Sequence, residues 1–177
     1  MAGTKHDVLT EEELAGYRLN PDLLVHLDAL LARHPGKTSA EINVLDWGCG
    51  RGRSVAKLRE RGFNAFGLEI DPRTLANGFA LFQQRGLVPT DLLKPVAEVG
   101  SFPDAFFHYR YVNELTFYRD NDVIRSEFIK GGFAAEYQVS GMSSRARRLL
   151  PQFLRRNGFP SGSVRLVVRR TVGVGPR

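Results

Sequence analysis

Three glycines and two acidic residues have the types and spacing to do chemistry. Gly48, Gly50 and Gly52 stand at alternate positions just after an apolar run that ends in Asp46. Glycine adopts backbone angles closed to other residues and lets the main chain approach a ligand with no Cβ in the way. Glu69 follows about 20 residues later, where a carboxylate can accept hydrogen bonds from both hydroxyls of a ribose. Together these residues predict an adenosine-like ligand.

This chemistry needs a strand, a turn, a helix and a second strand to position it. The apolar residues 42–45 predict the first strand, and the spacing of Val55 and Leu58 predicts a helix that closes at residues 61–62. The apolar residues 65–68 predict a second strand that ends at Glu69. This order is typical of the opening of a nucleotide-binding α/β domain.

The glycine spacing separates two classes of cofactor. A dinucleotide fingerprint requires G-x-G-x-x-G, but Arg53 stands where the third glycine would be, which disfavours an NAD-dependent oxidoreductase. The segment Asp46–Gly52, followed by Glu69–Asp71, resembles motif I and the acidic loop of class I S-adenosylmethionine-dependent methyltransferases. The resemblance extends from about Ile42 to Phe107.

The resemblance implies S-adenosylmethionine as the cofactor and assigns roles to single residues. Gly48, Cys49 and Gly50 would lie along its methionine and ribose parts, and Asp46 would orient the loop or reach the amino group. Glu69 would hold the ribose and Ile70 would pack on the adenine. Asp91 would touch the adenine amino group from the end of a third strand over residues 87–92, although capping a helix is an equally consistent role.

We predict an α/β fold, a doubly wound Rossmann-like sheet with helices on both faces, abbreviated after the fourth strand. Residues 1–40 form an N-terminal helical segment and residues 41–177 the Rossmann-like domain, within one domain overall. Thr10 and Glu13 predict a short helix to about residue 18, and Asn20 with Pro21 begins a second helix. By the resemblance Tyr17 could be a lid residue; a half-buried aromatic is the alternative.

The chain after the second strand continues the pattern and then departs from it. Asp71 and Pro72 begin a helix that ends at residues 85–86, and residues 102–109 resemble the entry to a fourth strand. Two interpretations of the remainder compete. In one, residues 129–132 are a turn into a fifth strand over 133–139. In the other, which we favour, a helix containing Ile124 ends at residues 131–133, and the region before the sixth strand has been lost.

The lost region would normally line the acceptor pocket, so few catalytic candidates remain. They are His108, Tyr109 and Glu114, each of which could instead satisfy a structural hydrogen bond. Ser143 or Ser144 begins a helix to Arg156 that Pro151 should break or bend. Residues 164–172 predict a final strand.

Composition limits the remaining functions. The 177 residues contain one cysteine, which excludes an internal disulfide and a cysteine-based metal cluster, and we expect no metal. No signal peptide or membrane span is evident, so we expect a soluble cytoplasmic protein. Residues 137–177 hold nine arginines and no acidic residue; removing these nine charges from the formal +6 leaves −3. This region could meet nucleic acid, an anionic membrane surface or a phosphorylated substrate, or could be a solvated face.

Two functional hypotheses follow. The first is a methyltransferase that acts on a small-molecule, saccharide or lipid-linked acceptor. The alternative is a non-catalytic module that binds the cofactor or assembles with a partner through its basic C-terminal part. A homodimer is also a hypothesis, because a shortened sheet leaves strand edges that a second copy could cover.

Overall fold

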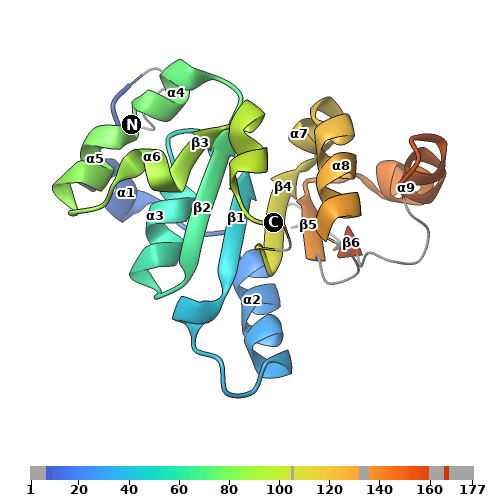
Figure 1. Cartoon of the computed structure of the whole chain (residues 1–177), viewed down its shortest axis with the longest axis horizontal. Coiled ribbons are helices and arrows are strands. Elements are labelled where there is room, and N and C mark those ends of the chain that lie inside the picture. The colour runs from blue at the N-terminus through green and yellow to red at the C-terminus, as the bar shows by residue number, and fades with distance from the viewer. Residues whose placement is uncertain (1–6, 105, 132–135, 160–165, 168–177) are drawn as a thin grey trace, which may run out of the picture.

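The computed structural model describes residues 7–104, 106–131, 136–159 and 166–167. Its centre is a parallel sheet in the order β3-β2-β1-β4-β5-β6, flanked by helices (Figure 1). The strands are β1 (Asn43–Trp47), β2 (Asn64–Glu69), β3 (Leu93–Pro95), β4 (Tyr109–Asn113), β5 (Glu136–Ser140) and β6 (Leu166–Val167). The chain moves outward from β1 to β3 and then returns to the other side of β1 as β4. This reversal is the switch point of a doubly wound α/β sheet, so the predicted fold class is confirmed.

Two helices precede the sheet, α1 (Glu11–Gly16) and α2 (Pro21–Arg33). They begin as predicted: Thr10 Oγ1 accepts from the amide of Glu13 at 3.2 Å, and Asn20 Oδ1 accepts from the amide of Asp22 at 2.9 Å. Their buried residues, Leu14, Leu23, Leu27 and Leu30, belong to the same hydrophobic core as the strands.

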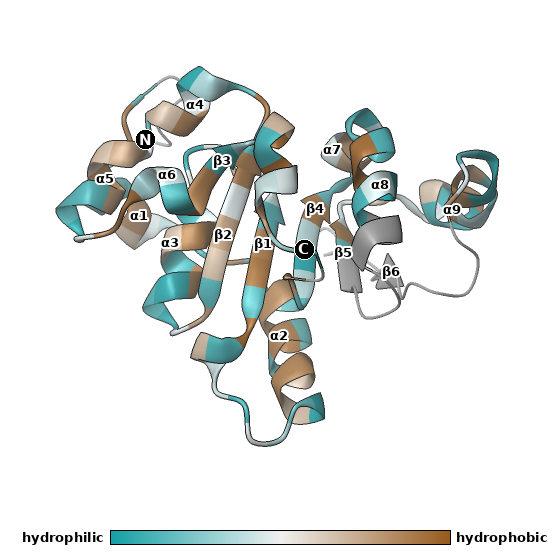
Figure 2. Cartoon of the chain, viewed as in Figure 1, coloured by the Kyte–Doolittle hydropathy of each residue, from teal (hydrophilic) through white to brown (hydrophobic). Residues whose placement is uncertain are grey.

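The unit from β1 through α3 (Arg53–Glu60) to β2 forms as predicted, and its strands pair in parallel. Hydrophobic residues run along β1 and β2 in the centre of the molecule (Figure 2). Trp47 at the end of β1 is 1% exposed, and its indole Nε1 donates to Asp120 at 2.9 Å. The sheet therefore has a well-packed centre next to the glycine turn.

The single helix that was predicted to begin at Asp71 and Pro72 and to end at residues 85–86 is two helices, α4 (Pro72–Ala76) and α5 (Phe79–Gln84). Gly78 lies between them, against the glycine turn. A Cβ on Gly78 would stand 2.0 Å from the carbonyl oxygen of Arg51. The chain thus changes direction at Gly78, where its backbone contacts the backbone of the glycine turn at Arg51. Only glycine permits so close an approach.

The third strand was predicted over residues 87–92, which is wrong. Pro89 begins a short helix, α6 (Pro89–Leu92), because proline is favoured in the first helical turn. The strand follows as β3 and pairs with β2 from Leu93 to Pro95. The helix η2 (Val96–Ser101) and the loop after it lead to β4.

The region after β4 combines the two competing interpretations. The helices α7 (Glu114–Arg119) and α8 (Asn121–Gly131) follow, so the predicted helix containing Ile124 is confirmed. However, β5 pairs directly with β4, from Tyr109 with Glu136 to Asn113 with Ser140. The strand after α8 therefore takes the fifth place in the sheet. Residues 132–135, where its start was predicted, lie outside the described residues.

The last helix, α9 (Ser144–Arg156), begins where Ser143 Oγ accepts from the amide of Ala146 at 3.1 Å. It continues through Pro151, so of the predicted break or bend the break is wrong. Pro151 is exposed, so water can satisfy the carbonyl that its missing N–H leaves without a partner. Of the strand predicted over 164–172, only β6 lies within the described residues. A short 3-10 helix, η1 (Ser39–Glu41), leads into β1.

Candidate cofactor pocket

A pocket of about 480 Å³ opens at the carboxyl ends of β1, β2 and β4. Parallel α/β sheets bind ligands at this edge, beside the switch point. The lining residues come from the end of α1, the glycine turn with the start of α3, the end of β2 with α4, and β4 with α7. They are Tyr17, Asp46, Gly48, Cys49, Gly50, Arg51, Arg53, Ser54, Glu69, Ile70, Asp71, Thr74, Tyr111, Asn113 and Arg119. The structure thus brings together Asp46, Gly48, Cys49, Gly50, Glu69 and Ile70 of the predicted cofactor residues.

The glycine turn presents bare backbone to this pocket. Gly48 and Gly50 have φ angles of 87° and 59°, in the left-handed region. A Cβ on Gly48 would stand 2.9 Å from Thr116 Oγ1, so this glycine lets α7 pack closely. A Cβ on Gly50 would meet nothing within 4 Å. Gly50 therefore borders the open space of the pocket.

Glu69 connects the end of β2 with the turn. Its Oε2 accepts from the amide of Gly50 at 2.9 Å, and its Oε1 accepts from the amides of Ile70 at 2.8 Å and Asp71 at 3.1 Å. An ionised carboxylate has about four acceptor positions, so one position on Oε2 remains for a ligand. Glu69 can hold one ribose hydroxyl here; holding both would require giving up a backbone hydrogen bond.

Asp46 lies at the end of β1 and is only 6% exposed. Burial raises the pKa of its carboxyl group to about 7; a hydrogen bond from Ser54 opposes this shift and the charge of Glu69 adds to it. The acid therefore titrates near neutral pH, and a cation in the pocket would favour its ionised form.

Cys49 and Ile70 differ in their access to the pocket. Burial, followed by the charges of Asp46 and Glu69, raises the pKa of the Cys49 thiol, so this thiol stays protonated at neutral pH. Ile70 is 51% exposed and offers an apolar surface at the pocket wall. Its predicted contact with an adenine stays a prediction.

Four predicted site residues do not line the pocket. Asp91 is exposed on α6, before β3 rather than at its end. His108 and Tyr109 stand at the amino end of β4, where the amide of Asn43 donates to His108 Nδ1 at 3.0 Å and Tyr109 donates to Gln138. A strand rises about 3.3 Å per residue, so Tyr109 lies about 13 Å along β4 from its carboxyl end. Glu114 begins α7 just outside the lining.

The prediction missed the residues that β4 and α7 actually contribute, Tyr111, Asn113 and Arg119. Arg119 Nε and Nη2 each donate to the buried Asp120 at 2.8 Å. Had the predicted strand been placed at the residues of β4, Tyr111 and Asn113 would have been expected at the pocket. Residues two apart share a face of a strand, and these two lie nearest its carboxyl end. Arg119 follows six residues after the strand and has no comparable signal.

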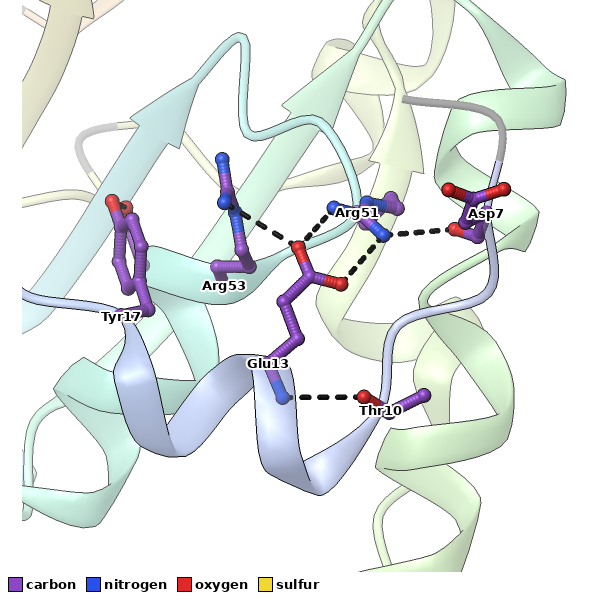
Figure 3. Close-up of polar contacts among 7 residues, drawn as sticks. Asp7, Thr10, Glu13, Tyr17, Arg51 and Arg53 are labelled. Carbon is purple, nitrogen blue, oxygen red and sulfur yellow. Dashed lines mark hydrogen bonds and ion pairs between the residues drawn. The ribbon is translucent and has the colours of Figure 1, made fainter. Parts of the chain in front are cut away.

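The N-terminal segment also reaches the pocket (Figure 3). Glu13 on α1 points toward Arg51 and Arg53 of the glycine turn and α3, and Tyr17 stands beside Arg53. Tyr17 Oη is 2.7 Å from Ser54 Oγ. The prediction considered Tyr17 but not the ion pair of Glu13 with Arg51, which joins residues far apart in the chain.

No protein-family model and no curated protein matches the sequence. Solved structures do: the methyltransferase domain of METTL16 matches with a TM-score of 0.55 and 16% identity, over 81% of this chain and 62% of that one. The chain has the class I methyltransferase fold. The PH0226 protein from Pyrococcus horikoshii OT3 matches with a TM-score of 0.50 and 18% identity, over 85% of this chain and 63% of that one.

The bifunctional kinase-methyltransferase WbdD matches with a TM-score of 0.46 and 17% identity, over 71% of this chain and 27% of that one. The chain thus spans 27% to 63% of the length of these three solved chains. None of the described helices combines the length and apolar character needed to cross a bilayer. Among the described residues, no group of three His, Cys, Asp or Glu side chains could hold a metal ion.

Proposed function

We propose that the chain is an S-adenosylmethionine-dependent methyltransferase acting on a small-molecule, saccharide or lipid-linked acceptor. One observation carries the proposal: the bare backbone of Gly50 and the carboxylate of Glu69 border one pocket, at the carboxyl ends of neighbouring parallel strands. This arrangement suits a ligand with a ribose, and the fold is the one that such methyltransferases use.

The residues present fit the cofactor. Asp46 would hold the amino group, because a cation relieves the cost of ionising a buried carboxyl group. Glu69 would hold a ribose hydroxyl with its remaining acceptor position, and Ile70 would pack against the adenine. When bound, the cofactor supplies an electrophilic methyl group on a positively charged sulfur.

The acceptor would lie against the residues from β4 and α7. Tyr111 and Asn113 offer hydrogen-bonding groups there, and the Arg119 guanidinium is held in place by Asp120. Tyr17 and Arg53 provide a further wall. Such walls exclude water and orient the acceptor, which transfer of a methyl group requires.

Calorimetric titration with S-adenosylmethionine and S-adenosylhomocysteine tests the cofactor site. We expect saturable binding by the wild type and a loss of about tenfold or more in Glu69→Gln, since a hydrogen bond to a charged group contributes about 1.5–3 kcal/mol. Glu98→Gln, an exposed residue outside the pocket, is the matched control and should bind normally.

Glu69→Ala is a less specific variant, because it also removes the acceptor for three backbone amides. Circular dichroism must therefore accompany each titration. A folded wild type that binds neither compound at about 1 mM, an affinity weaker than about −4 kcal/mol, would refute the proposal. If binding is found, release of S-adenosylhomocysteine across an acceptor panel measures turnover.

A second candidate is the non-catalytic module, which the surface of α9 favours. Arg145, Arg148, Arg155 and Arg156 are exposed on this helix, and hydrophilic residues cover much of it (Figure 2). On this hypothesis the protein binds a polyanion such as RNA, with an affinity that falls steeply between about 50 and 200 mM salt. Binding that ignores salt would contradict it.

A further inference from the structure

The N-terminal segment supplies one pocket wall through a single aromatic residue. Tyr17 follows the last residue of α1, lines the pocket and is partly buried. The guanidinium carbon of Arg53 lies 4.7 Å from the centre of its ring, and its hydroxyl is bonded to Ser54 at 2.7 Å. Ring and hydroxyl are therefore both held in place.

The chemistry of Ser54 decides the direction of these hydrogen bonds. When a cation ionises Asp46, its carboxylate can only accept hydrogen bonds, and Ser54 is the hydroxyl that lowers its pKa. A Ser54 hydroxyl that gives its one hydrogen to Asp46 then accepts from Tyr17 Oη, which lies 2.7 Å away. The lone pairs of the Tyr17 oxygen are then free to accept a hydrogen from a group in the pocket. Burial raises the pKa of Tyr17, so the phenol keeps its own proton at neutral pH.

The same hydrogen bonds indicate which ligand group would donate to Tyr17. They lead from Tyr17 through Ser54 to Asp46, a buried acid that a nearby positive charge would ionise. An ammonium group carries a positive charge and three N–H donors. It could therefore serve Asp46 with one donor and Tyr17 with another, whereas a neutral hydroxyl group would bring no charge.

Glu13 stands one helical turn before Tyr17 and ties the same segment to the glycine turn. Glu13 makes a bidentate ion pair with Arg51, in which Oε2 lies 2.9 Å from Nη1 and Oε1 contacts Nη2. The Arg51 side chain is 4% exposed, belongs to the glycine turn and also donates to the carbonyl of Asp7 at 2.9 Å. Arg53 Nη1 reaches Glu13 at 3.5 Å. Figure 3 shows this carboxylate between the two arginines.

Asn20 also ties the N-terminal segment to the pocket, since its Nδ2 donates to the Oη of the lining residue Tyr111 at 3.1 Å. Two further contacts of the segment lead elsewhere. The amide of Leu9 donates to the carbonyl of Asn77 at 2.8 Å, and Glu11 pairs with Arg85. Neither reaches the glycine turn. Removing the Glu13 charge would leave a buried guanidinium without its counterion, which is strongly unfavourable. We expect Arg51 to move in response and α1, with Tyr17, to move with it.

We propose that Glu13 is a positioning residue, which through Arg51 holds the Tyr17 oxygen where it accepts a hydrogen bond from the ammonium group of the bound ligand. This inference rests on the proposed function, because the ammonium group is that of the methionine part of the cofactor. Glu13 itself touches no ligand. Its effect on binding passes through Tyr17.

A pair of ligands separates this contact from a general role in packing. S-adenosylhomocysteine carries the ammonium group and 5′-methylthioadenosine lacks it, while both carry the adenosine. In calorimetric titration we expect Tyr17→Phe to weaken S-adenosylhomocysteine about tenfold, as for one hydrogen bond to a charged group, and to leave 5′-methylthioadenosine within about twofold. Glu13→Gln should likewise weaken the binding of S-adenosylhomocysteine more than that of 5′-methylthioadenosine.

Glu12→Gln is the matched control, because Glu12 stands in the same turn of α1 but is exposed. The double variant Glu13→Gln/Tyr17→Phe should lose no more than the worse single variant, since both changes act on one contact. Hydrogen exchange of the α1 amides reports whether the helix has moved in Glu13→Gln. Tyr17→Phe removes only one hydroxyl and should fold in any case.

Three results would overturn the assignment: equal losses for both ligands in Tyr17→Phe, full affinity of Glu13→Gln for S-adenosylhomocysteine, or losses that multiply in the double variant. A wild type that binds S-adenosylhomocysteine normally while Tyr17→Phe does too would refute the contact but leave the proposed function intact. A wild type that binds neither ligand would refute both.

Discussion

The carboxyl group of Asp46 shows how one residue acquires its chemistry from its surroundings. In the unfolded chain it has the ordinary pKa of 3.8, and in the folded protein burial raises this pKa to about 7. Between these two values the folded protein holds a proton that the unfolded chain releases. Raising the pH therefore favours unfolding until the folded group has also lost its proton.

The variant Asp46→Asn should remove this pH dependence. Asparagine stays neutral and keeps nearly the same volume, so the stability of the variant relative to the wild type should increase by about 2 kcal/mol between pH 5 and pH 7, at 1.36 kcal/mol for each pKa unit. Urea unfolding at several pH values measures the difference. A flat difference for Asp46→Asn would contradict the assignment.

The break between α4 and α5 shows how a contact between elements overrides a local pattern. The apolar spacing of Leu75, Phe79 and Phe82 suits one continuous helix. Contact of Gly78 with the Arg51 carbonyl instead turns the chain there. The same turn carries the backbone of the pocket, so α5 supports the site from outside it, while α4 contributes Thr74 to the pocket wall.

Gly78→Ala should destabilise the protein by about 3 kcal/mol, the upper end of the usual cost of overpacking. The cause is steric, because φ at Gly78 is −89° and suits any residue. Gly100→Ala is the control: a Cβ there meets nothing within 4 Å, and its effect should stay within about 0.5 kcal/mol. Chemical unfolding measures both, and equal effects would show that the contact is not tight.

At the scale of the whole molecule, the N-terminal helices and the sheet form one core. Leu14, Leu23 and Leu27 are buried in the same cluster as Leu45 and Trp47. The helices α1 and α2 are therefore a structural part of this core, and the single domain overall stays a prediction. Trp47 is the only tryptophan in the chain, so its fluorescence reports on β1 alone.

Leu27→Ala should lower the free energy of unfolding, measured by Trp47 fluorescence, by about 2–5 kcal/mol, the usual cost of truncating a buried leucine. Leu27 is fully buried, whereas Val25 on the same helix is 47% exposed, so Val25→Ala is the matched control. Urea unfolding followed by Trp47 fluorescence and by circular dichroism should give coincident transitions. An unchanged Trp47 transition in Leu27→Ala would mean that α2 unfolds separately from the sheet.

Self-association stays a prediction at this scale. A homodimer would cover an open edge of the sheet, and light scattering over a range of protein concentrations tests it. A monomer at every concentration would contradict the hypothesis.

Local signals in the sequence were sufficient for the elements that depend on neighbouring residues. Thr10, Asn20 and Asp71 begin helices as predicted, because a cap is a contact between residues two or three positions apart. The turn between β1 and α3 and the acidic residue at the end of β2 could likewise be predicted, since glycine spacing and strand ends depend on residues that are close together in the sequence. These features determined the fold class and most of the residues on the cofactor side of the pocket.

Contacts between distant residues decided the rest. The place of β5 next to β4 and the break at Gly78 depend on which backbones meet, and no short stretch of sequence encodes that. Tyr109 begins β4 and His108 precedes it, so Tyr109 lies about 13 Å, and His108 farther, from the carboxyl end of the strand, where the pocket opens. Glu13 meets Arg51 only because α1 folds back onto the glycine turn. The sequence determined the glycine turn after β1 and the acidic residue after β2, and only the tertiary structure decided which side chains surround them, because packing brings those side chains together from segments that are far apart in the chain.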